Sequence, residues 1–467
     1  MRIADPSADA LWALQTFGHA ELPDLRLNGR LVELAACWAA KPGSSIPQAC
    51  GSWARTKAAY RFLENHRVSW EALALAAAQA TARQCAGQPA ILVLQDTTTI
   101  SLPGLKACVG LGPIGEADGV RGLFLHHAVA VQTNGQPIGL LHSEIWARDP
   151  ACHGQAAQRK ARPFEAKESA RWVRGLRGAR ARIAEQWPAA ARPRLIHVMD
   201  REGDIHEVMA EVQAGGDGAV IRCAHNRSVQ APERCAHDAV RAAPLLGRVQ
   251  LQVPRQRGQP KREAEVEVRA RRVTLDPDPE KYPQRRPLSL RLIEVWEPAP
   301  PPGVEPLHWY LWTTEAVTSL AEALSVVAFY ALRWRIEDIH LVLKEGCRAE
   351  KLQLETAECL ANALLLYDTL AIRMVALREA ARQSPEAPCT VVLQESEWRT
   401  LWTRQHGKAP RPEEAPPSVR EAVLWIGRLG GHLGRHRDGL PGVRTLWRGW
   451  RDLMLLARFY EQLYSDP

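Results

Sequence analysis

The chain has 467 residues, with 60 Lys and Arg against 52 Asp and Glu, so its formal net charge is +8. A hydrophobic fraction of 46% with 24% charged residues excludes a chain that is disordered throughout, and the length predicts two to four domains. The apolar runs stay below the ~18 residues of a membrane span, with Ser319–Tyr330 as the best candidate. The N-terminus lacks the apolar core of a signal peptide, so we expect a cytoplasmic protein without a membrane partner.

The first 72 residues are predicted to form a helical domain. Asp24 is a suitable N-cap for a helix over Arg26–Ala40, Pro42-Gly43 interrupts the chain, and helical spacing resumes over Ser52–Leu63. Between Asp24 and Arg67 there are seven basic residues and three acidic ones. Short helices with a basic excess are compatible with a DNA-docking module.

The middle of the chain alternates strand-like and helix-like segments. Apolar runs of strand length occupy Ala90–Leu94, Leu123–Val131 and Leu195–Met199. This alternation favours an α/β sheet domain over about residues 73–383. Between Gly247 and Val295 the apolar residues follow a period of two on both sides of a central glycine, which predicts a β-hairpin inserted into that domain.

After about Gln383 the composition changes again. The stretch Lys408–Pro417 is rich in Pro and Glu, and it precedes a tail with helical spacing that contains Trp425, Trp447 and Trp450. We expect residues 384–467 to form a separate helical domain.

The excess positive charge is concentrated in two stretches. Nine Lys or Arg lie between Gln155 and Arg182 with only two Glu, and a second group runs from Arg255 through Arg262 to Arg291. Such clusters favour a polyanionic partner, because phosphates neutralised by Lys or Arg release condensed counterions. A solvated helix face accounts for each cluster equally well.

Two other motifs have weaker ligand interpretations. Cys223-x-His225 and Cys235-x-His237 supply four soft ligands, but structural zinc sites usually separate paired ligands by two or more residues, so incidental pairs are favoured. Gly110–Gly115 has the spacing G-x-G-x-x-G, but Pro113 and Gly119 leave no helix after it. A loop between strands is therefore favoured over a dinucleotide site.

Two of the strand-like runs end on an aspartate. Asp96 follows the first run and Asp200 follows the third. Acids at the C-terminal edge of a sheet lie where α/β proteins gather ligands and metals. Taken singly, each is more often a turn or cap residue.

A third set of polar residues follows a helical period over Tyr330–Lys344. At 100° per residue, Arg333, Glu337 and Lys344 lie within roughly 60° of Tyr330, so one helix face carries a phenol, a guanidinium, a carboxylate and an ammonium. A solvated stripe of salt bridges is the alternative, although the adjacent Trp334 is an unusual neighbour for one.

Three carboxylates from three separate elements suit divalent metal ions. Two Mg²⁺ about 3.5–4 Å apart can activate an attacking hydroxyl and stabilise the leaving oxygen of a phosphodiester. Asp96, Asp200 and Glu337 together therefore predict nuclease-like chemistry, with nearby basic residues holding the DNA backbone.

These motifs resemble the DDE transposases of the IS-four family, in particular its Tn-five-type members. The family signature Y-x(2)-R-x(3)-E-x(6)-K is complete in Tyr330, Arg333, Glu337 and Lys344, and Asp96 and Asp200 match its two aspartate strands. The resemblance covers nearly the whole chain, with further matches at Tyr60-Arg61-Phe62, Lys167-Glu168-Ser169, Trp309 and Arg428-Leu429-Gly430-Gly431.

The resemblance implies an α/β fold with an RNase H-like catalytic domain, interrupted by a β-rich insertion at about residues 206–325. Helical domains would flank it, the N-terminal one recognising transposon ends and the C-terminal one forming a homodimer in a synaptic complex. The implied activity is cut-and-paste transposition, in which the protein nicks the end, forms and opens a DNA hairpin, and joins the 3′-OH to target DNA.

The resemblance also implies roles for individual residues. Asp96, Asp200 and Glu337 would ligate two Mg²⁺, for which Mn²⁺ can substitute. Several residues would contact double-stranded DNA: Tyr330, Arg333 and Lys344 at phosphates, Trp309 and Trp334 by base stacking, Arg222 and the Arg255–Arg262 stretch along the groove, and Arg26, Arg30 and Arg61 in end recognition. Stacking an extruded base offsets an unstacking cost of a few kcal/mol. For Trp309, a core position in the inserted sheet is the alternative.

Two other functions compete with transposition. A catalytically silent end-binding protein or inhibitor would keep the DNA contacts without needing all three carboxylates. A metal-dependent nuclease without strand transfer would use the same metal site and differ only in its products.

Overall fold

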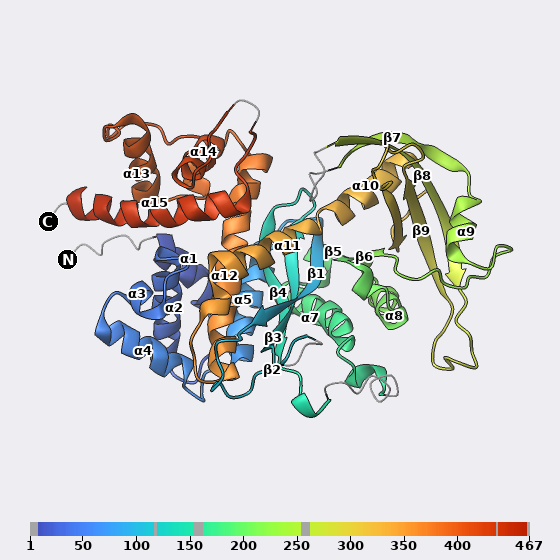
Figure 1. Ribbon diagram of the computed structural model, residues 1–467, viewed down its shortest axis with the longest axis horizontal. Coiled ribbons are helices and arrows are strands. Elements are labelled where there is room, and N and C mark those ends of the chain that lie inside the picture. Colours follow the sequence, from blue (N-terminus) through green and yellow to red (C-terminus); the bar gives the residue numbers. More distant parts are fainter. Residues whose placement is uncertain (1–7, 116–118, 153–161, 254–261, 436–437, 465–467) are drawn as a thin grey trace.

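The computed structural model describes residues 8–115, 119–152, 162–253, 262–435 and 438–464. One ten-stranded sheet crosses the molecule, with helices gathered at the end where both chain termini lie (Figure 1). The strands are β1 (Ala90–Ser101), β2 (Gly112–Pro113), β3 (Arg121–Gln132), β4 (Pro137–Trp146), β5 (Arg194–Met199), β6 (Gly218–Arg222), β7 (Leu245–Val253), β8 (Arg262–Leu275), β9 (Leu288–Trp296) and β10 (His308–Thr313).

The strand order is β2-β3-β1-β5-β6-β10-β9-β8-β7, and β4 pairs with β3. β1 pairs antiparallel with β3 and parallel with β5, so the three predicted apolar runs are adjacent central strands. Leu92 and Leu94 pack into the core cluster that includes the long C-terminal helix, whereas Ile91 and Val93 pack against the opposite cluster. Burial on both faces explains why the run is continuously apolar.

The predicted hairpin belongs to a longer β-meander. β7 and β8 pair antiparallel, with Val249 opposite Val266, as the period-two pattern indicated. β9 and β10 add two more strands, and β10 joins β6, with Leu311 opposite Arg222. The expectation of a two-stranded hairpin therefore missed two strands, β9 and β10, and the four strands together extend the central sheet. Gly258 lies outside the described residues.

Helices form both ends of the described chain, as predicted. Asp24 accepts a hydrogen bond from the Arg26 backbone N–H at 2.9 Å and caps α2, and Ser52 caps α4. The N-terminal helices are α1 (Ala8–Phe17), α2 (Leu25–Ala40), α3 (Ile46–Cys50), α4 (Trp53–Leu63) and α5 (Trp70–Gln84). The C-terminal helices are α12 (Ala357–Gln383), α13 (Glu395–His406), α14 (Val419–Leu429) and α15 (Val443–Tyr464).

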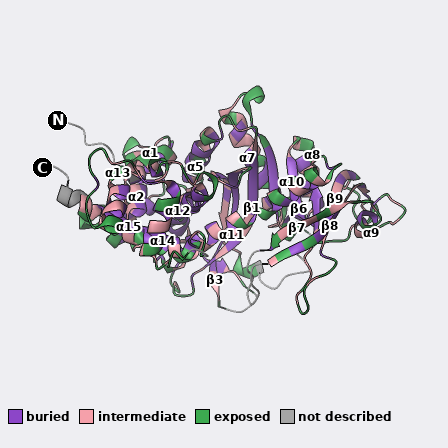
Figure 2. Ribbon diagram, turned by 90° about the horizontal axis from the view of Figure 1, so that it is seen from above, coloured by how far each residue is buried: buried purple, intermediate pink, exposed green. Residues whose placement is uncertain are grey.

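Further helices cover the sheet or follow its strands. They are α7 (Ala170–Gln186), α8 (His206–Gly215), α9 (Ala236–Arg241), α10 (Leu320–Ala331) and α11 (Trp334–Leu341). Seen from above, buried residues line the sheet and its covering helices (Figure 2). The core therefore follows the sheet.

α12 is long and apolar enough to span a membrane, with a mean hydropathy of 1.5 in its most apolar window. Yet 89% of that window is buried inside the protein, as in a core helix. The expectation that Ser319–Tyr330 is the best candidate was wrong, because charged residues within α12 mask its apolar length in the sequence.

The expectation of one continuous helix over Tyr330–Lys344 was also wrong. α10 ends at Ala331, α11 begins at Trp334, and a π-helical turn covers Val342–Gly346. At the join the Arg333 N–H donates to the Tyr330 carbonyl, an i→i−3 bond that tightens the chain. Tyr330 therefore lies on a different helix from Glu337, while Arg333 and Glu337 keep their i,i+4 relation.

Candidate catalytic site

The two aspartates lie side by side because of strand register. β1 and β5 are parallel, with Ala90 opposite Arg194 and Leu94 opposite Val198. The same register, continued by two residues, places Asp96 opposite Asp200. Asp200 follows the last residue of β5 and accepts the Glu202 backbone N–H at 2.8 Å. Both carboxylates thus lie just beyond the paired residues of β1 and β5. Asp200 follows its strand as predicted, but the expectation that Asp96 ends its strand was wrong, because β1 continues to Ser101 through its pairing with β3.

The third carboxylate is linked to the first by Arg333. α11 packs against β1, and the Arg333 guanidinium lies 2.6 Å from the Glu337 carboxylate and 3.6 Å from that of Asp96. The Arg333 side chain is 8% exposed, whereas that of Glu337 is 42% exposed. One buried cation therefore binds two of the predicted metal ligands.

Burial and neighbouring charge act together on Asp96. Burial, then the nearby Asp200 carboxylate, raise the pKa of Asp96 to about 7, despite the Thr97 N–H bond and the Arg333 charge. Glu337 raises it further. A carboxyl group whose pKa is strongly raised by its surroundings is a frequent feature of functional sites.

Sequence reasoning missed the buried histidines behind Asp96. His340 Nδ1 is 4.0 Å from the Asp96 carboxylate, and His340 Nε2 is 3.1 Å from His127 Nδ1. His127 Nε2 in turn lies 3.2 Å from the Asp368 carboxylate on α12. Burial lowers the pKa of His340 well below its usual value. A chain of polar side chains therefore runs from Asp96 into the core, and only long-range contacts could have revealed it.

A second missed residue is Arg171 of α7. Its Nε donates to Thr97 Oγ1 at 2.8 Å, and its second nitrogen donates to Glu202 at 2.7 Å. Arg171 thus joins the residues that follow Asp96 and Asp200. The sequence shows it as one member of a basic run, without a sign of this role.

The three carboxylates fit hard divalent cations, but Arg333 forms ion pairs with two of them, Asp96 and Glu337. Carboxylate oxygens are ligands that Mg²⁺ accepts. Among the described residues, no three His, Cys, Asp or Glu side chains form a ready-made metal cluster. Arg333 binds one oxygen of Glu337, so a metal held by all three carboxylates would use the other Glu337 oxygen or displace Arg333. Cys223 and His237 approach to 3.4 Å without forming such a cluster, and Gly112–Pro113 is the short strand β2 of a strand-connecting loop.

Three predicted DNA-binding residues form an aromatic and cationic cluster beside this site. The Trp309 ring lies edge-on to Tyr330, with centroids 5.4 Å apart. The Arg222 guanidinium lies 5.6 Å from the Trp309 ring centroid, and burial lowers the pKa of Arg222 to about 10. Arg201 and Arg333 lower it further. The sheet brings these residues together because β6 and β10 are neighbours.

The other predicted DNA-binding residues lie around and beyond this cluster. Trp334 is 50% exposed with Arg333 5.1 Å from its ring, and Lys344 is half-buried in the π-helical turn. Arg26 and Arg30 on α2 are paired with Asp24 and Glu33, and Arg61 is exposed on α4. These three arginines belong to the N-terminal helices, so the structure does not bring them to the carboxylates.

The basic run on α7 forms ion pairs within the protein. Arg174 pairs with Glu144, Arg177 with Glu211, and Arg180 with both Glu211 and Asp217. These pairs give the three arginines partners within the protein, from distant segments of the chain, so their positive charge is not evidence for a polyanionic partner. Arg159, Lys160 and residues 255–261 lie outside the described residues, and Arg262 pairs with Glu297.

Comparison with protein-family models matches both ends of the chain. Residues 9–68 match a transposase DNA-binding model, and residues 369–466 match a transposase Tn5 dimerisation domain. The first range contains α1–α4, and the second contains most of α12 together with α13–α15. Together the matches support a Tn5-type transposase that processes DNA, binds DNA and forms a homodimer.

Proposed function

We propose that the protein is a DDE transposase of the IS-four family that moves DNA by a cut-and-paste mechanism. The observation that carries the proposal is the arrangement of three carboxylates between the two matched ends: Asp200 acts on Asp96 through its charge, and Arg333 pairs with both Asp96 and Glu337. A protein that only binds transposon ends has no need for a buried carboxylate with a pKa of about 7. The site therefore favours an active enzyme over a silent end-binding protein.

The central strands support an RNase H-like catalytic core. β1 has antiparallel neighbours on one side and parallel neighbours on the other, and the two aspartates lie at adjacent positions on β1 and after β5. Helices cover both faces of this part of the sheet. The meander β7–β10 then carries Trp309 to the edge of the site.

Asp96, Asp200 and Glu337 would hold two Mg²⁺ or Mn²⁺, which when bound activate a hydroxyl and stabilise the leaving oxygen. Arg333, released from Glu337, would bind a phosphate of the DNA end, together with Tyr330 and Lys344. Arg333 thus has two roles, pairing with carboxylates before binding and with DNA afterwards. The same site would serve nicking, hairpin formation, hairpin opening and strand transfer.

Trp309 is proposed to stack on a base extruded during hairpin formation. We expect Trp309→Ala to slow hairpin formation about tenfold and the first nick much less, because base stacking contributes ~1–3 kcal/mol. Timed denaturing gels separate the two steps, and Trp309→Phe, which keeps an aromatic face, should restore most of the rate. Equal slowing of both steps would assign Trp309 to the core.

DNA binding should weaken steeply with salt. Each phosphate contact adds about −0.9 to the slope of log K against log salt, so several contacts give a slope of several units. Fluorescence anisotropy between 50 and 200 mM salt measures it. A flat response would contradict phosphate binding by this basic chain.

A cleavage assay tests the proposed function directly. Linear DNA carrying the sequences that flank the gene is incubated with the protein and Mg²⁺, and the products are resolved on a denaturing gel. Flush cuts with hairpin-ended intermediates are expected. Cleavage without hairpins or strand transfer would indicate a nuclease, and binding without cleavage would indicate the silent end-binding protein.

A further inference from the structure

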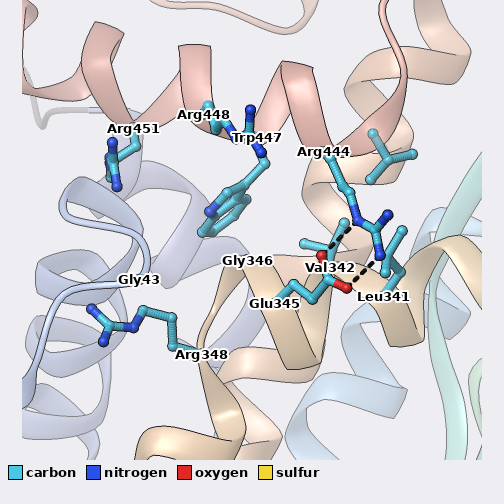
Figure 3. Close-up of a pocket in the computed structure, with 11 residues that line it drawn as sticks. Gly43, Leu341, Val342, Glu345, Gly346, Arg348, Arg444, Trp447, Arg448 and Arg451 are labelled. Carbon is cyan, nitrogen blue, oxygen red and sulfur yellow. Dashed lines mark hydrogen bonds and ion pairs between the residues drawn. The ribbon is translucent and has the colours of Figure 1, made fainter. Parts of the chain in front are cut away.

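A cavity of about 230 Å³ lies between three segments that are distant in the sequence (Figure 3). Its wall comes from Gly43 in the turn between α2 and α3, from the π-helical turn Val342–Gly346, and from α15. Four arginines surround it: Arg348, Arg444, Arg448 and Arg451. It lies outside the carboxylate site, although Lys344 of the DNA-binding signature belongs to the same π-helical turn.

The positive charge of this cavity is only partly neutralised within the protein. Glu345, the one acid among the described lining residues, accepts hydrogen bonds from Nε and Nη2 of Arg444 at 2.6 and 2.5 Å. In the part of the chain that the structure describes, Arg348 and Arg448 have no carboxylate partner, and both are exposed. The cavity therefore keeps at least two guanidinium groups without a direct ion pair, although the pKa of Glu345 is lowered by Arg444 and, more weakly, by Arg448.

The cavity floor is held by close backbone packing. A Cβ on Gly346 would meet the Trp447 ring at 2.8 Å, and a Cβ on Gly43 would meet the Gly346 carbonyl oxygen at 2.6 Å. Arg348 has the left-handed φ of 58°, which is costly for a residue other than glycine. A π-helical turn and a strained arginine are features that cluster at functional sites.

More positive charge lies where the end of α2 approaches α15. Burial and the nearby Arg458 of α15 lower the pKa of Lys41, at the end of α2. The positive charges of Lys41 and Arg458 thus repel each other, and Lys41 Nζ donates a hydrogen bond to the Gln48 carbonyl oxygen at 2.6 Å. Such repulsion is relieved when a polyanion binds.

We propose that this arginine cavity binds a backbone phosphate of double-stranded DNA. The inference rests on the proposed function and adds a contact outside the carboxylate site and the DNA-binding signature. The volume is below the ~300–1,000 Å³ of typical small-ligand sites, so it suits one phosphate group better than a whole nucleotide. Arg348 follows the π-helical turn and Arg448 lies on α15, so the two guanidinium groups that would bind the phosphate come from two elements of the cavity wall.

The test compares two double variants that remove the same charge. Arg348→Ala/Arg448→Ala removes the free guanidinium groups, and Arg404→Ala/Arg420→Ala removes two exposed arginines from α13 and α14. The probe is a duplex carrying the sequence that flanks the gene. We expect the cavity variant to bind it about tenfold more weakly at low salt and to lose about one unit of salt slope, with the control variant near wild type. Arg348→Lys/Arg448→Lys should keep most of the slope.

A second arm locates the phosphate. Duplexes with single neutral methylphosphonates are bound by wild type and by the cavity variant, and one position should weaken wild type while leaving the variant unchanged. The proposal would be overturned if every methylphosphonate weakened the cavity variant as much as wild type. It would also be overturned if the two double variants had equal slopes of log K against log salt. A changed dimerisation constant with unchanged DNA binding would overturn it too, by assigning the cavity to the homodimer. Failure of wild type to bind the duplex would instead contradict the proposed function.

Discussion

Glu337→Gln is expected to abolish strand cleavage while DNA binding survives. The substitution keeps the shape of the side chain and removes the charge that would bind a metal. A loss of ~4 kcal/mol of transition-state stabilisation corresponds to about a 10³-fold slower reaction. Rates of nicking, hairpin formation and strand transfer should fall together, because one metal site would serve all steps. A denaturing-gel time course with Mg²⁺ measures the rates, and anisotropy measures binding.

Asp338→Asn provides a matched control for this variant. Asp338 is the next residue of α11, and its substitution by Asn removes one negative charge, as Glu337→Gln does. Its carboxylate, however, pairs with Arg378 of α12 at 2.7 Å. We expect its cleavage rate to stay within a few-fold of wild type at a temperature where it is folded. Residual cleavage by Glu337→Gln at a rate close to wild type would remove Glu337 from the metal site.

Asp96→Asn is expected to inactivate the enzyme and at the same time stabilise the metal-free protein at pH 8. The pKa of Asp96 is raised from 3.8 to about 7 in the folded state. The folded state therefore holds a proton that the unfolded chain releases, and the stability contributed by this group is lost as pH rises from about 4 to 7. A shift of this size corresponds to about 4 kcal/mol of folding stability at pH 8, a loss that the neutral amide avoids.

Thermal melting in the presence of a chelator tests this prediction. The melting temperature of Asp96→Asn should exceed that of wild type at pH 8, and the difference should vanish near pH 4. Added Mg²⁺ should raise the melting temperature of wild type at pH 8 and leave the variant unchanged. Asp452→Asn, which removes an exposed charge on α15, should show neither effect. A variant less stable than wild type at pH 8 would contradict the electrostatic account of Asp96.

The carboxylate site could be predicted from the sequence because its parts are local motifs. Asp96 and Asp200 each follow a buried apolar run, although β1 continues past Asp96 to Ser101, and Arg333 and Glu337 are four residues apart at the start of α11. The family-model matches at both ends support the transposase class that these motifs suggested. The metal ligation and the hairpin mechanism stay predictions.

Other parts could not be predicted because they depend on partners far apart in the sequence. The arginines of α7 resemble a DNA-binding run, yet Glu144, Glu211 and Asp217 neutralise three of them. The Tyr330–Lys344 pattern fits one helix, but the chain tightens at Arg333 and forms a π-helical turn after Leu341.

The sequence by itself determined the helical ends, the buried central strands and the residues able to form a metal site, since caps, apolar period and motif spacing are properties of short segments. Only the tertiary structure decided which charges remain free. Strand register set Asp96 beside Asp200, the turn at Arg333 let one guanidinium bind two carboxylates, and packing of α15 against the π-helical turn assembled the arginine cavity. Each of these depends on contacts between segments that chain-local patterns do not record.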